Sequence, residues 1–185
     1  MQYAIELYFD QETEKKLAAL AQSVAEAGLS TAFLEWKTRP HLTLACFNDV
    51  DEEACAARLE AFARSHQAMP AHIGSIGMFN DTRTIFASPV MNRSMYQFQA
   101  ELHECFRDQD ATGWAWYAPD RWVPHCTLAL TGKDEDSVFY QASELLLRAF
   151  RKMSGELTSV GLVKITRPVQ EIASVGLGGS GGIGG

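Results

Sequence analysis

Two histidines in this chain stand in nearly the same short sequence. The segment RPHLTLAC in the first half returns as VPHCTLAL in the second half. Each copy places a threonine two residues after a histidine, His41 with Thr43 and His125 with Thr127. Residues i and i+2 of a strand face the same side, so each copy should present an imidazole and a hydroxyl together. Two such pairs facing one cleft would make a symmetric acid–base site around a phosphate.

This combination of groups suits the cleavage of a phosphodiester. The reaction removes a proton from the attacking oxygen and delivers another to the leaving oxygen. An imidazole has an ordinary pKa of about 6.5, so both of its protonation states are populated near neutral pH. Each positioned proton transfer is worth roughly 10²–10⁴ in rate. The threonine hydroxyls could donate to the non-bridging phosphoryl oxygens. The chemistry demands neither a metal nor a cofactor.

A structural role and a zinc site are the two other interpretations of these histidines. An isolated His-x-Thr in a strand is usually structural, and it is the repeated context that favours catalysis. Zinc bound by His41 and His125 would need further ligands, and no His-x-His, Cys-x-x-Cys or His-Glu-x-x-His motif supplies them. No metal site is therefore predicted. Cys46 and Cys126 lie in strand-like segments and are expected to be buried free thiols.

Apolar periodicity predicts the elements that must position the two motifs. Strands are expected at residues 3–9, 33–37, 41–47, 71–79, 84–90, 122–131, 158–167 and 172–177. Helices are expected at about 10–28, from 49 or 51 to 65, 94–106 and 137–153. The first strand alternates apolar and polar residues, so it is expected to be half-buried. A polar and aromatic loop is expected between the third helix and the second histidine strand.

The order of these elements favours an α+β fold with largely antiparallel sheets, because no glycine-rich turn links a strand to a helix. The two histidine strands occupy comparable places in the two halves of the chain. We expect residues 1–177 to form one domain of two similar lobes, each of largely antiparallel sheet with outer helices. A pseudo-two-fold axis would relate the lobes across a central cleft. Residues 178–185 are expected to be a flexible, glycine-rich tail.

The composition limits the kind of partner. The chain has 185 residues and a formal net charge of −7, whereas a protein that coats nucleic acid needs a basic face. A small nucleotide or a single RNA end remains possible, because a few local cations suffice. The apolar runs are too short to cross a bilayer, and the N-terminus lacks a basic-then-apolar signal pattern. We therefore expect no membrane interaction and a cytoplasmic location. The sequence does not indicate the oligomeric state.

The paired motifs resemble those of the 2H phosphoesterase superfamily, which is named for its two histidines. Within it, the chain is similar to the 2′-5′ RNA ligase-like and cyclic phosphodiesterase proteins over about residues 1–177. The resemblance implies a bilobal α+β fold and a metal-independent phosphodiesterase mechanism. It also implies substrates with a 2′,3′-cyclic phosphate or a 2′-5′ linkage, and possible reversible ligation. It assigns catalytic roles to His41, Thr43, His125 and Thr127.

A nucleotide site also needs an aromatic platform and cations. Phe47 ends the first histidine strand and Trp122 begins the second, so both are candidates for stacking on a base. Trp114, Trp116 and Tyr117 crowd the loop just upstream. The candidate cations, which flank the motifs or lie in the loop at 80–84, are Arg39, Arg83 and Arg121. His66, His72 and His103 have no partner motif and are expected to be structural or exposed.

Several functions remain open at this point. The substrate could be a 2′,3′-cyclic phosphate, a 2′-5′-linked or cyclic oligonucleotide, or the end of a long RNA. A non-catalytic nucleotide-binding module would keep the same cleft but show no turnover. Which histidine acts as acid and which as base also stays undecided.

Overall fold

The structure is a computed structural model, and it describes residues 2–109 and 115–178. The elements in chain order are β1 (Tyr3–Phe9), α1 (Gln11–Glu26), α2 (Ala32–Trp36), β2 (His41–Phe47), α3 (Glu52–Arg64), β3 (Met69–Phe79), β4 (Thr84–Pro89), α4 (Arg93–Cys105), the 3₁₀ turn η1 (Ala115–Tyr117), β5 (Cys126–Leu130), α5 (Asp136–Ala149), β6 (Met153–Lys164) and β7 (Gln170–Gly176). The fold is α+β, as the sequence predicts.

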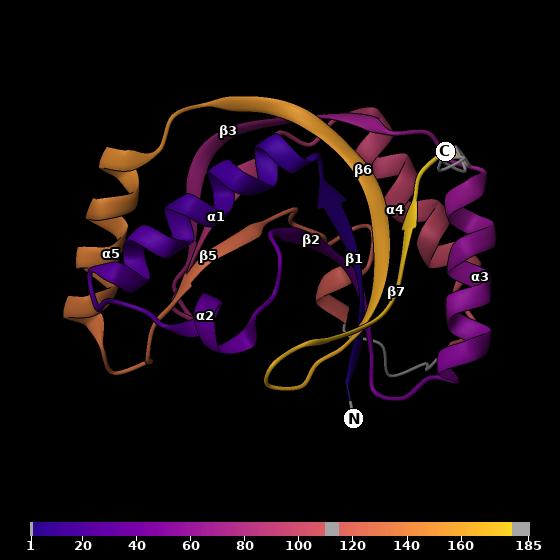
Figure 1. The fold of residues 1–185 in the computed structure, drawn as a ribbon, viewed down its shortest axis with the longest axis horizontal. Helices are drawn as coiled ribbons and strands as arrows, with labels where there is room; N and C mark the ends of the chain where they lie inside the picture. The colour runs from indigo at the N-terminus through magenta and orange to yellow at the C-terminus, as the bar shows by residue number, and fades with distance from the viewer. Residues whose placement is uncertain (1, 110–114, 179–185) are drawn as a thin grey trace, which may run out of the picture.

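The strands form one curled sheet in the order β2-β1-β6-β3-β4-β5, with β7 added alongside β6, and every pairing in the described chain is antiparallel (Figure 1). When β1, β2 and β3 are exchanged with β4, β5 and β6, the same order results, read from the opposite edge of the sheet. The two halves of the chain are thus related by a pseudo-two-fold symmetry of topology. The histidine strands β2 and β5 are equivalent edge strands, and they contact each other across the curl of the sheet.

One helix from each half of the chain packs against the histidine strand of the other half. Helix α1 from the first half contacts β5 in the second, and α4 from the second half contacts β2 in the first. In Figure 1, α1, α2 and α5 lie on the β5 side of the molecule, and α3 and α4 lie on the side of β1, β6 and β7. Each histidine strand is therefore supported by a helix from the opposite half.

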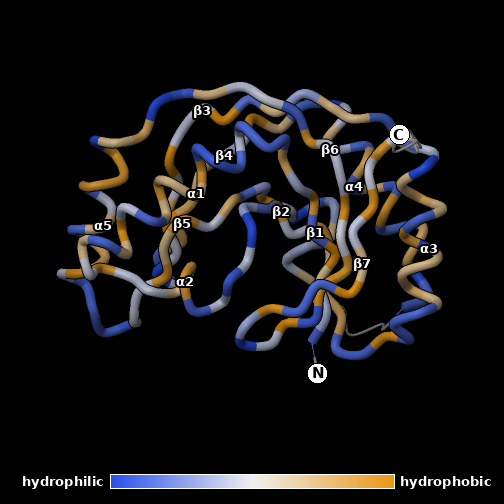
Figure 2. Tube along the Cα trace, in the orientation of Figure 1, coloured by the Kyte–Doolittle hydropathy of each residue, from blue (hydrophilic) through white to orange (hydrophobic). Residues whose placement is uncertain are grey.

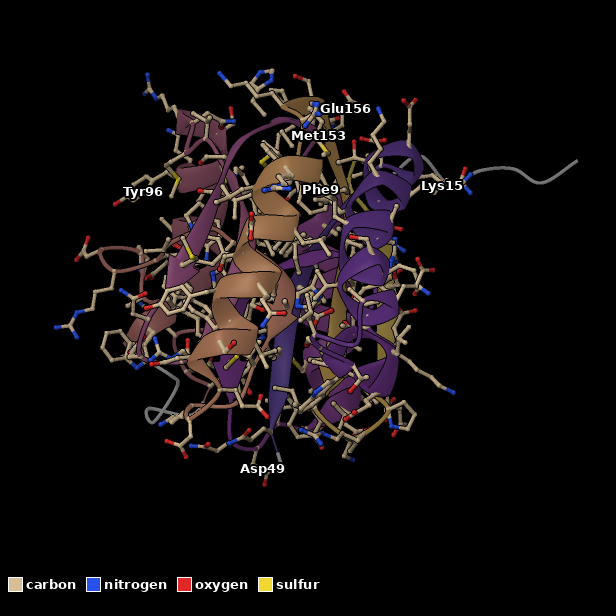
Figure 3. All side chains as sticks on the ribbon, turned by 90° about the vertical axis from the view of Figure 1, so that its left-hand side faces the viewer. Phe9, Lys15, Asp49, Tyr96, Met153 and Glu156 are labelled. Atoms are coloured by element: carbon tan, nitrogen blue, oxygen red, sulfur yellow. The ribbon has the colours of Figure 1, made fainter. Side chains whose placement is uncertain are left out.

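Local sequence explains where the helices begin and which face they bury. Asp10 caps α1 by accepting from the backbone N–H groups of Glu12 and Thr13, and Asp51 and Asn92 cap α3 and α4 in the same way. Figure 2 shows apolar and polar residues mixed along the outer helices, as amphipathic helices require. In Figure 3, Lys15 on α1 extends outward, whereas Phe9, at the end of β1, is fully buried.

Three expectations about elements were wrong. Residues 33–37 lie mostly in the short helix α2, because an aromatic-rich run of five residues does not distinguish helix from strand. The second histidine strand begins only at Cys126, since Pro124 has no N–H for a strand pairing. Strand β1 is buried along its whole length, because its polar face lies against other residues rather than water.

The cysteines are free, as expected for Cys46 and Cys126, which are both buried. Of the helices in the described part of the chain, none is long and apolar enough to cross a membrane.

Candidate active site

The two motifs have the same local geometry. Leu42 and Cys126 are buried, while the histidine and threonine on either side of each are only half-buried. This alternation matches the expectation for His41 and Thr43 on β2, and it extends to His125, which directly precedes β5. His41, Thr43 and Thr127 line one cavity of about 320 Å³, a volume typical of small-ligand sites.

Both imidazoles are held by the backbone in the same orientation. Nδ1 of His41 lies 2.7 Å from the carbonyl oxygen of Arg39, and Nδ1 of His125 lies 2.7 Å from that of Val123. A carbonyl can only accept, so each Nδ1 carries a proton and donates it. This leaves Nε2 as the atom of each ring that can exchange a proton with a substrate.

His125 lies just beyond the lining of the cavity, among aromatic rings. Its ring meets Phe79 and Phe86 edge-to-face, with centroids 5.0 and 5.4 Å away. Burial lowers the pKa of His125 below its ordinary value, and the charge of His41 lowers it further, although the hydrogen bond to Val123 opposes the shift.

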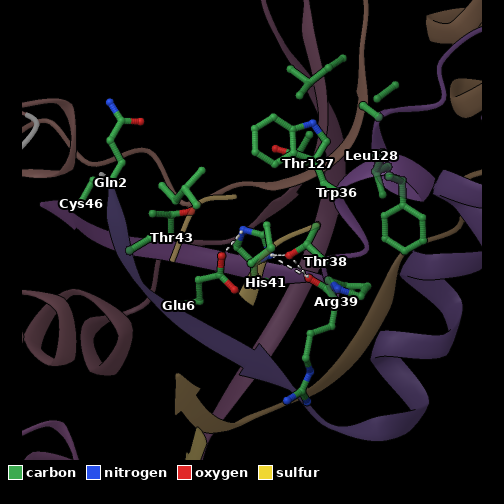
Figure 4. Close-up of a pocket in the computed structure, with 18 of the residues that line it drawn as sticks. Gln2, Glu6, Trp36, Thr38, Arg39, His41, Thr43, Cys46, Thr127 and Leu128 are labelled. Atoms are coloured by element: carbon green, nitrogen blue, oxygen red, sulfur yellow. Dashed lines mark hydrogen bonds and ion pairs between the residues drawn. The ribbon is translucent and has the colours of Figure 1, made fainter. Parts of the chain in front are cut away.

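His41 has a carboxyl partner that the sequence did not indicate. Its Nε2 lies 3.3 Å from Oε1 of Glu6, which is buried on β1 (Figure 4). The hydroxyl of Tyr8 donates to the other oxygen of Glu6 at 3.0 Å. Thr38 lies near the far side of the ring, with its hydroxyl 3.3 Å from Nδ1. The only sequence signal was a glutamate at a polar position of the first strand.

The cavity also has an aromatic wall formed by residues outside the motifs. Phe33 and Trp36 of α2 line it, together with Ile165 and Val169 from the connection between β6 and β7. The backbone N–H of Val169 donates to the carbonyl of Trp36 at 2.8 Å, which fixes α2 against this connection. The Arg167 guanidinium lies over the Trp36 ring, 4.4 Å from its centroid.

Of the upstream aromatic loop, Tyr117 lines the cavity together with Thr43 and Cys46. Trp116 is 74% exposed. Trp114 lies outside the described residues.

The predicted aromatic platforms do not reach the cavity. Phe47 is buried and packs against Phe106, with ring centroids 6.2 Å apart. Trp122 is also buried, and its indole nitrogen donates to the carbonyl oxygen of Thr43 at 2.9 Å. Both side chains support the site from the core instead of facing a ligand.

The predicted cations occupy different surroundings. Arg39 lines the cavity, but its guanidinium bonds Glu14 through Nε at 2.9 Å and lies over the Tyr8 ring. Arg83 pairs with Asp136 on α5, away from the residues that line the cavity. Arg121 is exposed in the turn before Trp122.

The remaining histidines lie away from the cavity lining, as the sequence predicts. His66 bonds Glu101 at 2.8 Å, His72 is exposed, and His103 bonds the carbonyl of Leu44 at 3.1 Å. In the described chain, no group of three or more His, Cys, Asp or Glu residues is arranged to hold a metal ion.

Comparison with known proteins identifies the family. The family model of the 2′-5′ RNA ligase superfamily matches residues 9–168. The chain belongs to the 2′-5′ RNA ligase superfamily. Its resemblance to the 2H phosphoesterases is thereby confirmed, and membership supports phosphodiesterase or RNA-end chemistry in general terms. No protein of curated function matches the sequence.

Solved structures share the fold of this superfamily member at low identity. LigT of E. coli complexed with NADP+ is 14% identical, with a TM-score of 0.56 over 95% of this chain and 96% of that chain. LigT complexed with 3′-AMP is 14% identical, with a TM-score of 0.55 over 95% and 97% of the two chains. The protein TT0787 of Thermus thermophilus is 19% identical, with a TM-score of 0.56 over 97% and 100%.

Proposed function

We propose that this protein is a metal-independent phosphodiesterase that opens a 2′,3′-cyclic phosphate on a small nucleotide or an RNA end. The observation that carries the proposal is the convergence of the two motifs: the equivalent edge strands β2 and β5 contact each other, His41, Thr43 and Thr127 line one cavity, and His125, directly before β5, lies just beyond that lining. A phosphate there would lie between two imidazoles, each held by a backbone carbonyl at Nδ1 and able to exchange a proton through Nε2. That is the arrangement that in-line proton transfer to and from a phosphodiester requires.

Each motif residue has a role in this reaction. One imidazole takes a proton from water as its oxygen attacks phosphorus, and the other gives a proton to the ribose oxygen as the P–O bond breaks. Thr43 and Thr127 donate hydrogen bonds to the non-bridging oxygens, where negative charge develops. In the reverse direction the imidazoles exchange roles, so the same site could join a hydroxyl to a cyclic phosphate.

The cavity supports a substrate of nucleotide size. Trp36 and Phe33 provide an aromatic wall on which a base could stack. LigT has been crystallised with NADP+, with ATP and with 3′-AMP, which supports a nucleotide ligand for this chain as well. The formal net charge of −7 disfavours an extended RNA surface.

The test is hydrolysis of a panel of 2′,3′-cyclic nucleotides and 2′-5′-linked dinucleotides in excess EDTA. We expect chelator-resistant turnover of a cyclic nucleotide, with loss of roughly 10²–10⁴ in kcat for His41→Ala and for His125→Ala. His72→Ala is the matched control, because His72 is exposed and lies outside the cavity lining.

Other outcomes would change the assignment. Turnover restricted to 2′-5′ dinucleotides would replace the proposed substrate while keeping the mechanism. Tight nucleotide binding without turnover of any substrate would indicate a binding module. Activity that EDTA abolishes and added metal restores would contradict the two-histidine mechanism.

A further inference from the structure

The pseudo-two-fold symmetry shows where the two halves of the site differ. In the first half Glu6 on β1 pairs with Thr43 on β2, and in the second half Phe86 on β4 pairs with Thr127 on β5. The strand register shifts immediately before Glu6 and immediately before Phe86. Glu6 and Phe86 therefore occupy equivalent positions, and each lies beside the histidine of its own half.

The neighbouring strands repeat this equivalence. Gly161 on β6 pairs with Glu6, and Gly77 on β3 pairs with Phe86. A Cβ at Gly161 would lie 2.6 Å from the hydroxyl of Tyr8, and a Cβ at Gly77 would lie 2.4 Å from the Phe86 ring. Each glycine thus leaves room for an aromatic ring beside its histidine. In the first half that ring carries a hydroxyl, which reaches Glu6.

The two histidines consequently have opposite surroundings. The ring of His41 is bonded on both sides, by the Arg39 carbonyl at Nδ1 and by Glu6 at Nε2. Around His125, the equivalent place is taken by the Phe86 ring, with Phe79 beside it. A carboxylate favours the protonated form of an imidazole, and an apolar surrounding favours the neutral form.

We propose that Glu6, held by the Tyr8 hydroxyl, is a positioning residue that keeps a proton on Nε2 of His41, so that His41 is the general acid and His125 the general base. This assignment rests on the proposed phosphodiesterase function. It depends on one difference between the two half-sites, Glu6 in the first and Phe86 in the second. The motif sequences alone do not contain that difference.

The proton transfers balance across one turnover. His125 Nε2 accepts a proton from water as the water oxygen bonds to phosphorus. The P–O bond to the leaving oxygen breaks, and that oxygen takes the proton from His41 Nε2. Glu6 then faces a neutral imidazole, and His125 carries the extra proton. Exchange with solvent returns one proton to the Glu6–His41 pair and removes one from His125.

Other charged groups around this pair are few among the described residues, and each has a clear effect. Burial raises the pKa of Glu6, whereas His41, the Tyr8 hydroxyl and Arg39 oppose that rise and Glu171 on β7 adds to it. The carboxyl of Glu6 therefore lies in a buried place where His41 is the first of the groups that favour its charged form. The charge of His41 also acts on His125, so deprotonation of the pair makes His125 easier to protonate.

The decisive variant is Glu6→Gln, which keeps the shape of the side chain and removes its charge. We expect kcat to fall roughly 10- to 100-fold, the scale of losing an orienting carboxylate. We expect KM to change little and the alkaline limb of the pH–rate profile to move to lower pH, because the general acid loses its proton sooner. Tyr8→Phe should produce the same changes to a smaller degree. Glu53→Gln, at an exposed position of α3, is the matched control.

A histidine titration separates this inference from the proposed function. The ring resonances of His41, followed by NMR without substrate, should titrate at lower pH in Glu6→Gln than in the wild type. This titration needs no turnover, so it tests the effect of Glu6 on His41 even if no cyclic nucleotide is hydrolysed. Wild-type kcat and an unmoved alkaline limb in Glu6→Gln would overturn the role of Glu6. If that variant does not fold, an unchanged profile in Tyr8→Phe would overturn it instead.

Discussion

The indole nitrogen of Trp122 lies 2.9 Å from the carbonyl oxygen of Thr43. A residue just upstream of the second motif therefore holds the backbone of the first. Because β2 is an edge strand, its outer carbonyl groups need such partners, and Gln99 and His103 of α4 supply them to the next carbonyl, that of Leu44. The two motifs are thus connected by the core as well as by the cavity.

Trp122→Phe should destabilise the protein and impair catalysis together. The variant keeps most of the buried ring but leaves the Thr43 carbonyl without its donor, at a cost of about 1–3 kcal/mol in the free energy of unfolding. Denaturant unfolding and kcat on a cyclic nucleotide measure the two effects. Trp116→Phe, at an exposed position, is the control. Equal stability of both variants would show that the hydrogen bond contributes nothing.

The pH dependence should reflect the low pKa of His125. A general base must be neutral, so the rate rises with pH through that pKa. Because burial and the charge of His41 lower it, the acidic limb should lie below the ordinary histidine value of about 6.5. Stability should depend on pH in the same direction. Because the pKa of His125 is lower in the folded protein than in the unfolded chain, the free energy of unfolding should fall as the pH drops below the ordinary histidine value. An acidic limb at or above the ordinary value would contradict the role given to His125.

Phe86→Leu tests the cause of that shift. The smaller side chain should admit water beside His125 and move the acidic limb to higher pH, while the alkaline limb stays in place. The Glu6→Gln variant should move the opposite limb. A pH–rate profile of both variants therefore distinguishes the two half-sites, and parallel movement of both limbs in Phe86→Leu would indicate a general structural change.

Thr43→Val and Thr127→Val should lower kcat without abolishing it. Each removes one donor to the phosphoryl oxygens while keeping the branched shape, a loss of about 1–3 kcal/mol in transition-state stabilisation. Thr43→Ser and Thr127→Ser keep the hydroxyl and should retain most activity. If the valine variants match the wild type, the hydroxyls have only a structural role.

Trp36→Ala should weaken substrate binding more than it slows chemistry. Loss of a stacking partner costs about 1–3 kcal/mol per base, so KM should rise roughly 5- to 150-fold with a smaller change in kcat. Trp116→Ala is the exposed control. An unchanged KM would mean that the base binds elsewhere or stays in solvent.

The arrangement of each motif followed from sequence because strand alternation is a local rule: a buried Leu42 or Cys126 leaves its neighbours on the open face. The fold class followed from the order of strands and helices in the same way. Glu6 was not predictable, because its contact with His41 depends on the register of β1 against β2 and on the shift just before Glu6. Trp36 was not predicted either, because an aromatic run of five residues fits a strand or a helix equally well.

The exchange of α1 and α4 between the halves has a consequence for how the chain can be divided. A fragment ending in the turn between β3 and β4 would keep β2 but lack α4, and its complement would keep β5 but lack α1. Each piece would expose a histidine strand without its covering helix, so neither should fold alone, although the two should reassemble when mixed.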